Sequence, residues 1–459
     1  MRPTTLKEIA LWCGGTVEER YENVTVTSLC HDTREAKAGA LFFALMGQTD
    51  GHRFVPIARE QGAAAAVCSH EVDVEFPVVM VEDTRKALRD IATAYKATLP
   101  CRTVAITGSV GKTTTRTMIS CLMEEKYHTC STVKNYNNDI GLPVTIGLTH
   151  PECEMLVLEM GMNHFGEMRT LTAIGHPDTV VITNIGSMHI ENLGSREGIL
   201  KAKLEILEGL NPGGDAIFNG DEPLLWNLRE RLTCDTTYFG IENEHCDLRG
   251  VDICLMEGKS TFRVVGKGYD FPVEIPVGGI HNVHNALGAI AAALRYEVPV
   301  EKIQTAMARY ENTSQRQQTY EKNGFIIIDD TYNAGPESME AALRVLGDTK
   351  GKGEKFRRIA VLGDMLELGN HANSEHYRIG RVAAYKADMI LTYGDLSRKI
   401  VSGAITGGVK ERNAMNFSTH EELVNVIKSR ARKGDVLLFK GSHGVRMDLV
   451  LEAFIKEDK

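Results

Sequence analysis

One stretch, Thr103–Thr115 (TVAITGSVGKTTT), constrains the fold of this chain more than any other. It begins as a β-branched, strand-like run, turns through Gly108 and Gly111, and enters a helix-like run over Thr113–Tyr127. Glycines let backbone N–H groups approach phosphate oxygens closely, and a helix N-terminus adds partial positive charge. In such a loop Lys112 would contact the outer phosphates and Thr113 would offer a hydroxyl to Mg²⁺. The stretch therefore predicts a phosphate-binding loop between a strand and a helix.

The match to the usual phosphate-loop pattern is incomplete. That pattern is G-x-x-x-x-G-K-[ST], and Ile106 stands where the first glycine is expected, so G-x-x-G-K-T remains. A glycine turn that merely precedes a helix is the alternative that this stretch alone leaves open.

Length and composition narrow the class of protein. The 459 residues predict about three domains on the usual prior of ~150 residues each. A net charge of −9 argues against a general nucleic-acid binder, so no nucleic-acid partner is expected. The ten cysteines include no C-x-x-C pair, so they are expected to be reduced thiols of a cytoplasmic protein. The charged N-terminus lacks a signal-peptide core and no run of about 18 apolar residues occurs, so no membrane insertion is expected.

The order of predicted elements gives an α/β fold with three domains. Residues 1–100 predict a small α/β unit, with a polar turn over 28–34. Residues 101–313 predict a parallel-sheet domain carrying the glycine loop, with an antiparallel meander added over 234–276. Residues 314–459 alternate strands and helices and predict a separate Rossmann-like sheet. This last unit has no G-x-G-x-x-G after its first strand, so a dinucleotide site is not indicated.

Polar residues follow two strands that come after the glycine loop. Glu159 ends one apolar strand, and the next is followed by a segment that reaches His189. Open α/β sheets bind ligands at the carboxyl ends of their strands, and hard cations prefer carboxylate oxygens. The pair therefore predicts a Mg²⁺ site beside the loop, although either residue alone could be an ordinary satisfied polar group.

Two further helices carry candidate residues. Lys201 and Lys203 are two positions apart on a predicted helix, so they point in different directions and at most one faces the site. Asn282 and Asn285 are three positions apart in the first turn of another helix. They could cap the helix or contact the edge of a base.

Together these residues resemble the Mur ligase family, ATP-dependent ligases that build the peptide of the bacterial cell-wall precursor. The family loop T-G-[ST]-x-G-K-[ST]-[ST] fits Thr107–Thr114 without the upstream glycine. Five further family features have counterparts in this chain. They are the Glu at the end of the next strand (Glu159), the N-x-x-x-x-H segment that reaches His189, the A-K helix with Lys203, the H-N-x-x-N-A helix with Asn282 and Asn285, and the arginine that opens the last domain, Arg316. Three stretches are most similar to the family members that add D-alanyl-D-alanine: Asn137–Pro143, Ile328–Pro336 and Val361–Gly369.

The resemblance implies an activity and its partners. A carboxylate of UDP-N-acetylmuramoyl-tripeptide would be activated by ATP as an acyl phosphate and attacked by the amine of D-Ala-D-Ala. The alternatives are a diamino-acid-adding Mur ligase, a folylpolyglutamate synthetase, or a phosphate-loop switch protein that needs no acceptor. A monomer would suffice for each of these activities.

The resemblance also assigns nucleotide and metal residues. Magnesium would be held at Thr113, Glu159 and His189, beside a lysine carbamylated by CO₂ at Lys203. The residues implied to contact ATP are Gly108, Ser109, Val110, Gly111, Lys112, Thr113, Thr114, Asn282, Asn285, Arg316 and Asp330.

The catalytic and substrate residues follow from the same resemblance. The implied catalytic set is Lys112, Glu159, His189, Lys203 and Arg316. The loop 47–54 would join in holding the UDP end, and His443 departs from the arginine common in the family, so it has no assigned role. The residues implied to contact the substrates are Asp32, Thr33, Arg34, Asn137, Asn138, Asn333, Asp364 and Glu367.

Overall fold

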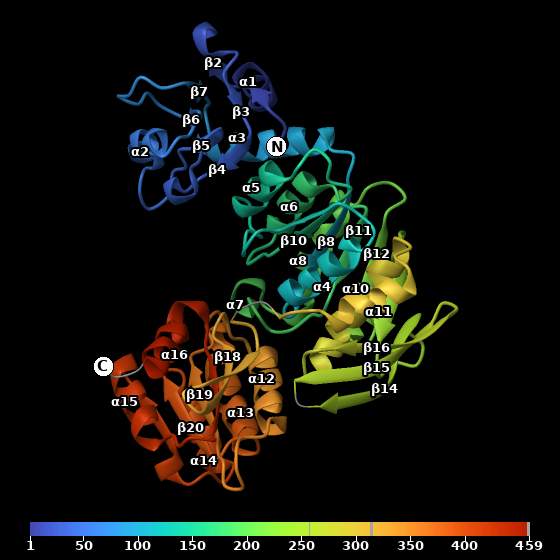
Figure 1. Ribbon diagram of the computed structural model, residues 1–459, viewed down its shortest axis with the longest axis vertical. Helices are drawn as coiled ribbons and strands as arrows, with labels where there is room; N and C mark the ends of the chain where they lie inside the picture. Colours follow the sequence, from blue (N-terminus) through green and yellow to red (C-terminus); the bar gives the residue numbers. More distant parts are fainter. Residues whose placement is uncertain (257, 313–314, 457–459) are drawn as a thin grey trace.

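The computed structural model describes residues 1–256, 258–312 and 315–456, which form one small two-stranded sheet and three larger sheets (Figure 1). In Figure 1 the blue N-terminal unit lies at the top, the central sheet in the middle and the orange C-terminal unit at the bottom. None of the described helices is both long and apolar enough to span a membrane.

The N-terminal unit is a five-stranded sheet with the order β2-β7-β6-β5-β4. Strands β4 to β7 are parallel, and β2 runs antiparallel at one edge. The predicted polar turn over 28–34 is wrong in its first half, because Ser28–Cys30 is buried and pairs with β5. The elements are α1 (Leu6–Cys13), β2 (Thr16–Val17), β4 (Ser28–Cys30), β5 (Ala40–Phe43), α2 (Val55–Glu60), β6 (Ala65–Cys68), β7 (Val78–Met80) and α3 (Thr84–Thr98). A separate pair joins β1 (Thr4–Thr5) to β3 (Thr25–Val26).

The central unit is one nine-stranded sheet with the order β16-β15-β14-β13-β12-β11-β8-β10-β9. Its parallel strands are β8 (Arg102–Thr107), β9 (Thr129–Ser131), β10 (Met155–Glu159), β11 (Thr179–Ile182), β12 (Asp215–Asn219) and β13 (Asp235–Gly240). Antiparallel pairing is confined to β14 (Leu248–Met256), β15 (Lys259–Gly266) and β16 (Tyr269–Ile275). The predicted meander over 234–276 therefore begins too early, because β13 extends the parallel sheet.

Helices cover both faces of this sheet, and every residue of β10 and β11 is buried. Strands buried on both faces are continuous apolar runs, which is why their sequences show no alternation. One face packs on α4 (Lys112–Glu124), α10 (Ile280–Arg295) and α11 (Val300–Ala308). The other packs on α3, α5 (Gly141–Leu148), α6 (Glu167–Gly175) and α8 (Arg196–Leu204). Short helices α7 (Ile190–Leu193) and α9 (Pro223–Trp226) complete the unit.

The C-terminal unit is a six-stranded sheet with the order β17-β18-β22-β19-β20-β21. All its pairs are parallel except β17 with β18. The predicted boundary at 313 and 314 lies outside the described residues. The elements are β17 (Gln318–Lys322), β18 (Phe325–Asp330), α12 (Pro336–Asp348), β19 (Arg358–Gly363), α13 (Ala372–Ala384), β20 (Met389–Tyr393), α14 (Arg398–Thr406), β21 (Ala414–Phe417), α15 (His420–Arg430), β22 (Val436–Lys440) and α16 (Met447–Ile455).

Candidate active site

A cavity of about 610 Å³ lies where the carboxyl ends of the central strands meet the C-terminal unit. The N-terminal unit contributes one lining residue, Arg85 of α3. Predicted site residues from both of the larger units line it together: Ser109, Val110, Gly111, Lys112, Thr113, Thr114, Asn137, Asn138, Glu159, His189, Asn282, Asn285, Arg316, Asp330 and Asn333.

The glycine loop has the backbone that a close phosphate contact requires. Gly108 and Gly111 have φ angles of +154° and +85°. A Cβ added at Gly108 would lie 1.9 Å from Thr183 Oγ1, and one at Gly111 would lie 2.4 Å from Asn285 Oδ1. No residue other than glycine fits at either position without moving its neighbours.

The neighbouring strand end holds this loop in place. Val110 N–H donates to Asn184 Oδ1 at 2.9 Å, and Gly186 N–H donates to Ser109 Oγ at 2.9 Å. The Lys112 ammonium donates to the carbonyl of Gly108 at 2.8 Å, so it folds back over the loop. Burial lowers the pKa of Lys112 below its usual value, and the nearby Arg316 lowers it further. An anionic ligand here would relieve both effects.

The oxygen atoms beside the loop fit a hard cation. Thr113 Oγ1 donates to Glu159 Oε2 at 2.8 Å, and Asn137 Nδ2 donates to the other carboxylate oxygen at 2.8 Å. Glu159 is only 2% exposed, and the nearest cation, Arg116, stands 4.0 Å from it. A buried carboxylate next to a hydroxyl is the kind of donor set that Mg²⁺ binds in phosphate-transfer sites.

His189 has backbone strain and an interdomain contact. Its φ is +65°, in the left-handed region that non-glycine residues rarely adopt. Its Nδ1 lies 2.5 Å from Glu367 Oε2 in the C-terminal unit, where Glu367 itself has a φ of +63°. Hydrogen bonding to His189 lowers the pKa of Glu367. Two strained residues thus face each other across the domain boundary.

The two helix lysines do point in different directions, as predicted. Lys203 is 2% exposed, whereas Lys201 is exposed and its Nζ lies over the ring of Phe165. Burial, assisted by the charge of Lys112, holds the pKa of Lys203 well below its ordinary value. Lys203 is not one of the described residues that line the cavity, but the charge of Lys112 in the phosphate loop acts on it.

Asn282 and Asn285 share a small polar network at the start of α10. Asn282 Nδ2 donates to the carbonyl of Gly278 at 2.8 Å, and Asn285 Nδ2 donates to Asn282 Oδ1 at 3.4 Å. Thr115 Oγ1 donates to Asn285 Oδ1 at 3.3 Å, which ties the phosphate-loop helix to α10. Both asparagines are buried, so their remaining hydrogen-bonding capacity is available only toward the cavity.

The C-terminal wall of the cavity carries a cation and an anion. The Arg316 guanidinium carbon lies 4.0 Å from the centre of the Tyr332 ring, within the range of a cation–π contact. Asp330 ends β18 and accepts a hydrogen bond of 2.6 Å from Lys440 Nζ at the end of β22. Lys440 also donates to the carbonyl of Asn333 at 2.8 Å, so it fixes the loop that follows β18.

Several predicted substrate residues lie elsewhere. Asp364 does not line the cavity, and its carboxylate accepts hydrogen bonds from the backbone and hydroxyl of Ser397. Asp32 accepts from the Arg34 backbone N–H and guanidinium, and the Arg34 side chain is 86% exposed. The turn Asp32–Arg34 belongs to the N-terminal unit, outside the set of described residues that line the cavity.

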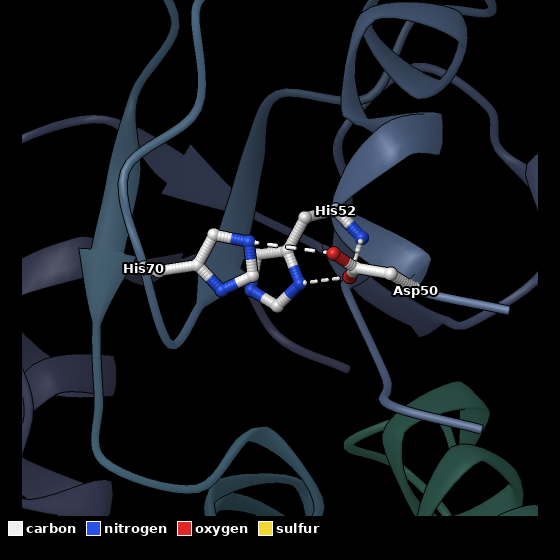
Figure 2. Close-up of side chains that lie close together, drawn as sticks. All are labelled: Asp50, His52 and His70. Carbon is white, nitrogen blue, oxygen red and sulfur yellow. Dashed lines mark hydrogen bonds and ion pairs between the residues drawn. The ribbon is translucent and has the colours of Figure 1, made fainter.

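The loop before α2 is fixed by an imidazole pair and a carboxylate (Figure 2). His52 Nδ1 lies 2.7 Å from Asp50 Oδ1, and His52 Nε2 accepts from Ser69 N–H at 2.8 Å. The ring of His70 stacks on His52 with centroids 3.7 Å apart. The Ser69 bond assigns the His52 proton to Nδ1, so both ring nitrogens are already used. The cluster therefore fits a brace for loop 47–54 better than a metal site.

Many residues that line the cavity carry no role in the sequence-based prediction, among them Lys440, Gln317 and Arg85. Lys440 follows an apolar strand, and that position was its only signal in the sequence. Gln317 donates its backbone N–H to Asp330 Oδ1, and its side-chain Oε1 accepts from Nε2 of half-buried His281 at 2.6 Å. Arg85 forms hydrogen bonds of 2.7 and 2.8 Å with Asp139, and no motif marks it.

Family models match almost the whole chain. The Mur ligase middle domain matches residues 106–293, and the Mur ligase glutamate ligase domain matches residues 315–443. The Mur ligase catalytic domain matches residues 25–108.

Individual relatives cover nearly the full length. The UDP-N-acetylmuramoyl-tripeptide–D-alanyl-D-alanine ligase of Bacillus subtilis (strain 168) is 38% identical over 459 residues, covering 98% of each chain. The enzyme of that name from Escherichia coli (strain K12) is 31% identical and covers 94% of each chain. Among solved structures, MurF from Acinetobacter baumannii is 29% identical with a TM-score of 0.89 and full coverage of both chains. MurF from Thermotoga maritima in complex with ADP is 28% identical with a TM-score of 0.80, covering 94% of this chain and 98% of that one. The sequence, the fold and the arrangement of the cavity agree, and the chain belongs to the Mur ligase family.

Proposed function

We propose that the chain is the ATP-dependent ligase that joins D-alanyl-D-alanine to UDP-N-acetylmuramoyl-tripeptide. The products are the UDP-linked pentapeptide precursor of peptidoglycan, ADP and phosphate. One observation carries the proposal: a single cavity joins the phosphate loop at Lys112 to Arg316 and Asp330 of the C-terminal unit. The full-length similarity to ligases of that name supports the choice of substrates.

The first step forms the acyl phosphate. A carboxylate oxygen of the tripeptide attacks the γ-phosphorus of ATP, and the bond to ADP breaks. Lys112, at the loop, and Arg316, on the opposite wall, supply positive charge to the oxygens that transfer. Asn282 and Asn285 would contact adenine, and Asp330, held by Lys440, would contact the ribose.

The second step forms the amide. The amine of D-Ala-D-Ala attacks the carbonyl carbon of the acyl phosphate, and the tetrahedral intermediate expels phosphate. Attack requires the amine to be unprotonated and close to the carbonyl, so most of the protein's contribution is positioning. Asn333 at the cavity wall is a candidate for this role. Asp364 and Glu367 remain candidates only if the C-terminal unit moves, because neither lines the cavity.

The donor atoms described above, a threonine hydroxyl and a buried carboxylate, are suitable ligands for magnesium. Thr113 and Glu159 would hold one ion and His189 would help to hold another. When bound, the metal neutralises phosphate charge and polarises the oxygens it contacts. Asn137 orients the Glu159 carboxylate, and Asn138 caps α5 through a 2.8 Å bond from Gly141 N–H.

Lys203 would act as an uncharged group. Its buried amine has no carboxylate partner among the described residues, and Lys112 repels its cation. A neutral amine can react with CO₂ to form a carbamate, which would add anionic oxygens at a position where the ammonium form would be repelled by Lys112. We propose this modification for Lys203, with the unmodified neutral amine as the alternative outcome.

The three units would divide the substrates. Residues 1–100 would hold the UDP end through the turn Asp32–Thr33–Arg34 and loop 47–54, and residues 101–313 would hold ATP. Residues 314–459 would close on the nucleotide and present the dipeptide. We expect a monomer that acts in the cytoplasm, where ATP and UDP-linked substrates are made.

Isotope transfer tests the chemistry directly. Tripeptide substrate labelled with ¹⁸O in the reacting carboxylate should deliver one ¹⁸O to the released phosphate, because the acyl phosphate oxygen leaves with phosphorus. Phosphate that contains no label would refute carboxylate activation. The label should be measured by mass spectrometry of the phosphate.

A further inference from the structure

Arg316, which lines the cavity, lies between two residues with strained backbone. Gln315 and Gln317 have φ angles of +61° and +49°, in the left-handed region that non-glycine residues rarely adopt. Such a conformation persists only where the surrounding structure holds it. The position of the Arg316 side chain therefore depends on what fixes its two neighbours.

The main chain of this segment is held by the C-terminal unit. Tyr332 N–H donates to the carbonyl of Gln315 at 3.2 Å, and Gln317 N–H donates to Asp330 Oδ1 at 3.2 Å. Asp330 is the last residue of β18, and Tyr332 follows two positions later. The segment is thus fixed at its ends to the carboxyl end of one strand.

The side chain of Gln317 is held by the central unit. Its Oε1 lies 2.6 Å from Nε2 of His281, in the first turn of α10. The His281 ring has room there because of a neighbouring glycine, since a Cβ added at Gly279 would lie 2.5 Å from His281 Cε1. The same Cβ would lie 3.4 Å from a methyl of Val345 in α12, so the C-terminal unit also packs against this turn. Gln317 therefore joins the two units, one through its main chain and the other through its side chain.

His281 makes this contact as a neutral imidazole. Burial lowers its pKa to about 4 and outweighs the opposite effect of the bond to Gln317, and the cations of Lys440 and Arg344 lower it further. A neutral imidazole carries one N–H and an amide oxygen can only accept, so the proton is assigned to Nε2. The N–H of the ring is therefore donated to Gln317 rather than to a ligand.

We propose that His281 and Gln317 are positioning residues that aim Arg316 at the γ-phosphate of bound ATP. Gln317 directly follows Arg316, so a rotation of the peptide between them would swing the arginine side chain. The hydrogen bond from α10 opposes that rotation and ties Arg316 to the helix that carries Asn282. The inference rests on the role proposed above for Arg316 and assigns two residues that act through it.

A direct contact with the base is the competing role for His281, because His281 and Asn282 both line the cavity. A base contact would support the binding of ADP and ATP equally, since the two nucleotides share the adenine. The aim of Arg316 would matter only for a nucleotide with a third phosphate. The two nucleotides therefore separate the two roles.

Calorimetric binding of ADP and of the non-hydrolysable ATP analogue AMP-PNP, each with Mg²⁺, tests the assignment. His281→Leu and Gln317→Leu should each weaken AMP-PNP binding about 10-fold, the effect of about one lost hydrogen bond, and change ADP binding less than about twofold. His281→Gln keeps a donor of similar reach, so it should bind both nucleotides as wild type does and provides the test if a leucine variant does not fold. His245→Leu, at an exposed histidine of the central unit, is the matched control and should change neither affinity.

The same assay tests whether the two residues act through Arg316. Arg316→Ala should weaken AMP-PNP binding more than either leucine variant, and adding His281→Leu to it should cause little further loss. The inference would be overturned by equal losses for ADP and AMP-PNP in His281→Leu, or by a His281→Gln variant as impaired as His281→Leu. A further loss of about 10-fold in the double variant, or unchanged AMP-PNP binding in Arg316→Ala, would also overturn it. None of these measurements needs the tripeptide or the dipeptide, so a failed ligase assay would refute the proposed substrates and leave this inference standing.

Discussion

Lys440 and Asp330 form a buried ion pair 2.6 Å long at the carboxyl ends of two adjacent strands. Their side chains are 2% and 10% exposed, so water does little to compensate either charge. The pair joins β22 to β18 directly below the cavity and holds a predicted nucleotide contact in place. Its position makes stability and nucleotide binding depend on the same two residues.

Replacing Lys440 with methionine should strongly destabilise the protein. The change keeps the volume but leaves the buried Asp330 carboxylate without its ion-pair partner, which costs about 3–5 kcal/mol of unfolding free energy. Urea unfolding measures this loss. Lys352→Met, which breaks the exposed Lys352–Glu321 pair, should cost less than about 1 kcal/mol. Equal losses in the two variants would show that the buried pair contributes no more than a surface one.

Changing Glu159 to glutamine should lower ligase activity without unfolding the site. Glutamine keeps the shape but removes the charge that would hold the metal beside Thr113. We expect kcat/KM to fall by about 10²–10³-fold and the Mg²⁺ requirement to rise. Steady-state assays over a Mg²⁺ series measure both effects. Glu152→Gln, at an exposed carboxylate before the same strand, should match wild type. An unchanged Mg²⁺ dependence in Glu159→Gln would remove the metal role.

Lys203 should be essential to activity and Lys201 should not. Lys203→Ala removes a buried side chain beside the phosphate loop, whereas Lys201→Ala trims an exposed one. If a carbamate supplies the missing charge, short carboxylates added to Lys203→Ala should restore part of the activity. The comparison requires ADP-release assays with and without added acetate or formate. Loss of activity in Lys201→Ala, with Lys203→Ala still active, would reverse the assignment.

The same lysine predicts a pH dependence of stability. The folded-state pKa of Lys203 is lowered, so between that value and its unfolded value of about 10.4 the unfolded chain binds more protons. Unfolding free energy should therefore rise with pH, by up to about 1.4 kcal/mol per unit, through this group. The Lys203→Met variant has no amine to titrate, so we expect it to have a higher unfolding free energy than wild type at about pH 7. This difference in unfolding free energy should become smaller by about pH 9. Urea unfolding at several pH values measures this difference. A difference that stays constant with pH would mean that Lys203 is charged in the folded protein.

Local sequence pattern located the parts of the site that belong to one strand–loop–helix unit, whereas the family resemblance supplied Asn282, Asn285, Arg316 and Asp330, which also line the cavity. Thr113 and the glycines share such a unit, and Glu159 ends the apolar strand β10, which pairs directly with β8, so spacing and strand-end position located them. Arg85 and Lys440 come from other units and reach the cavity only through tertiary packing. Local spacing therefore gave no signal for Arg85 and only a weak one for Lys440.

The direction in which β13 pairs with its neighbour could not be predicted from the local sequence pattern either. Strand β13 (Asp235–Gly240) was predicted as part of an antiparallel meander because its short apolar stretch resembles those that follow it. Its pairing with β12 is parallel, and this choice depends on the chain crossing over through α9.

The dipeptide dependence of ADP release tests the proposed function most directly. The purified protein is supplied with ATP, Mg²⁺ and UDP-N-acetylmuramoyl-tripeptide, and ADP is measured with and without D-Ala-D-Ala. We predict sustained ADP release only when both substrates are present, with one pentapeptide formed per ADP. ADP release that is the same without the dipeptide would contradict the proposed ligase and favour a nucleotide-driven switch.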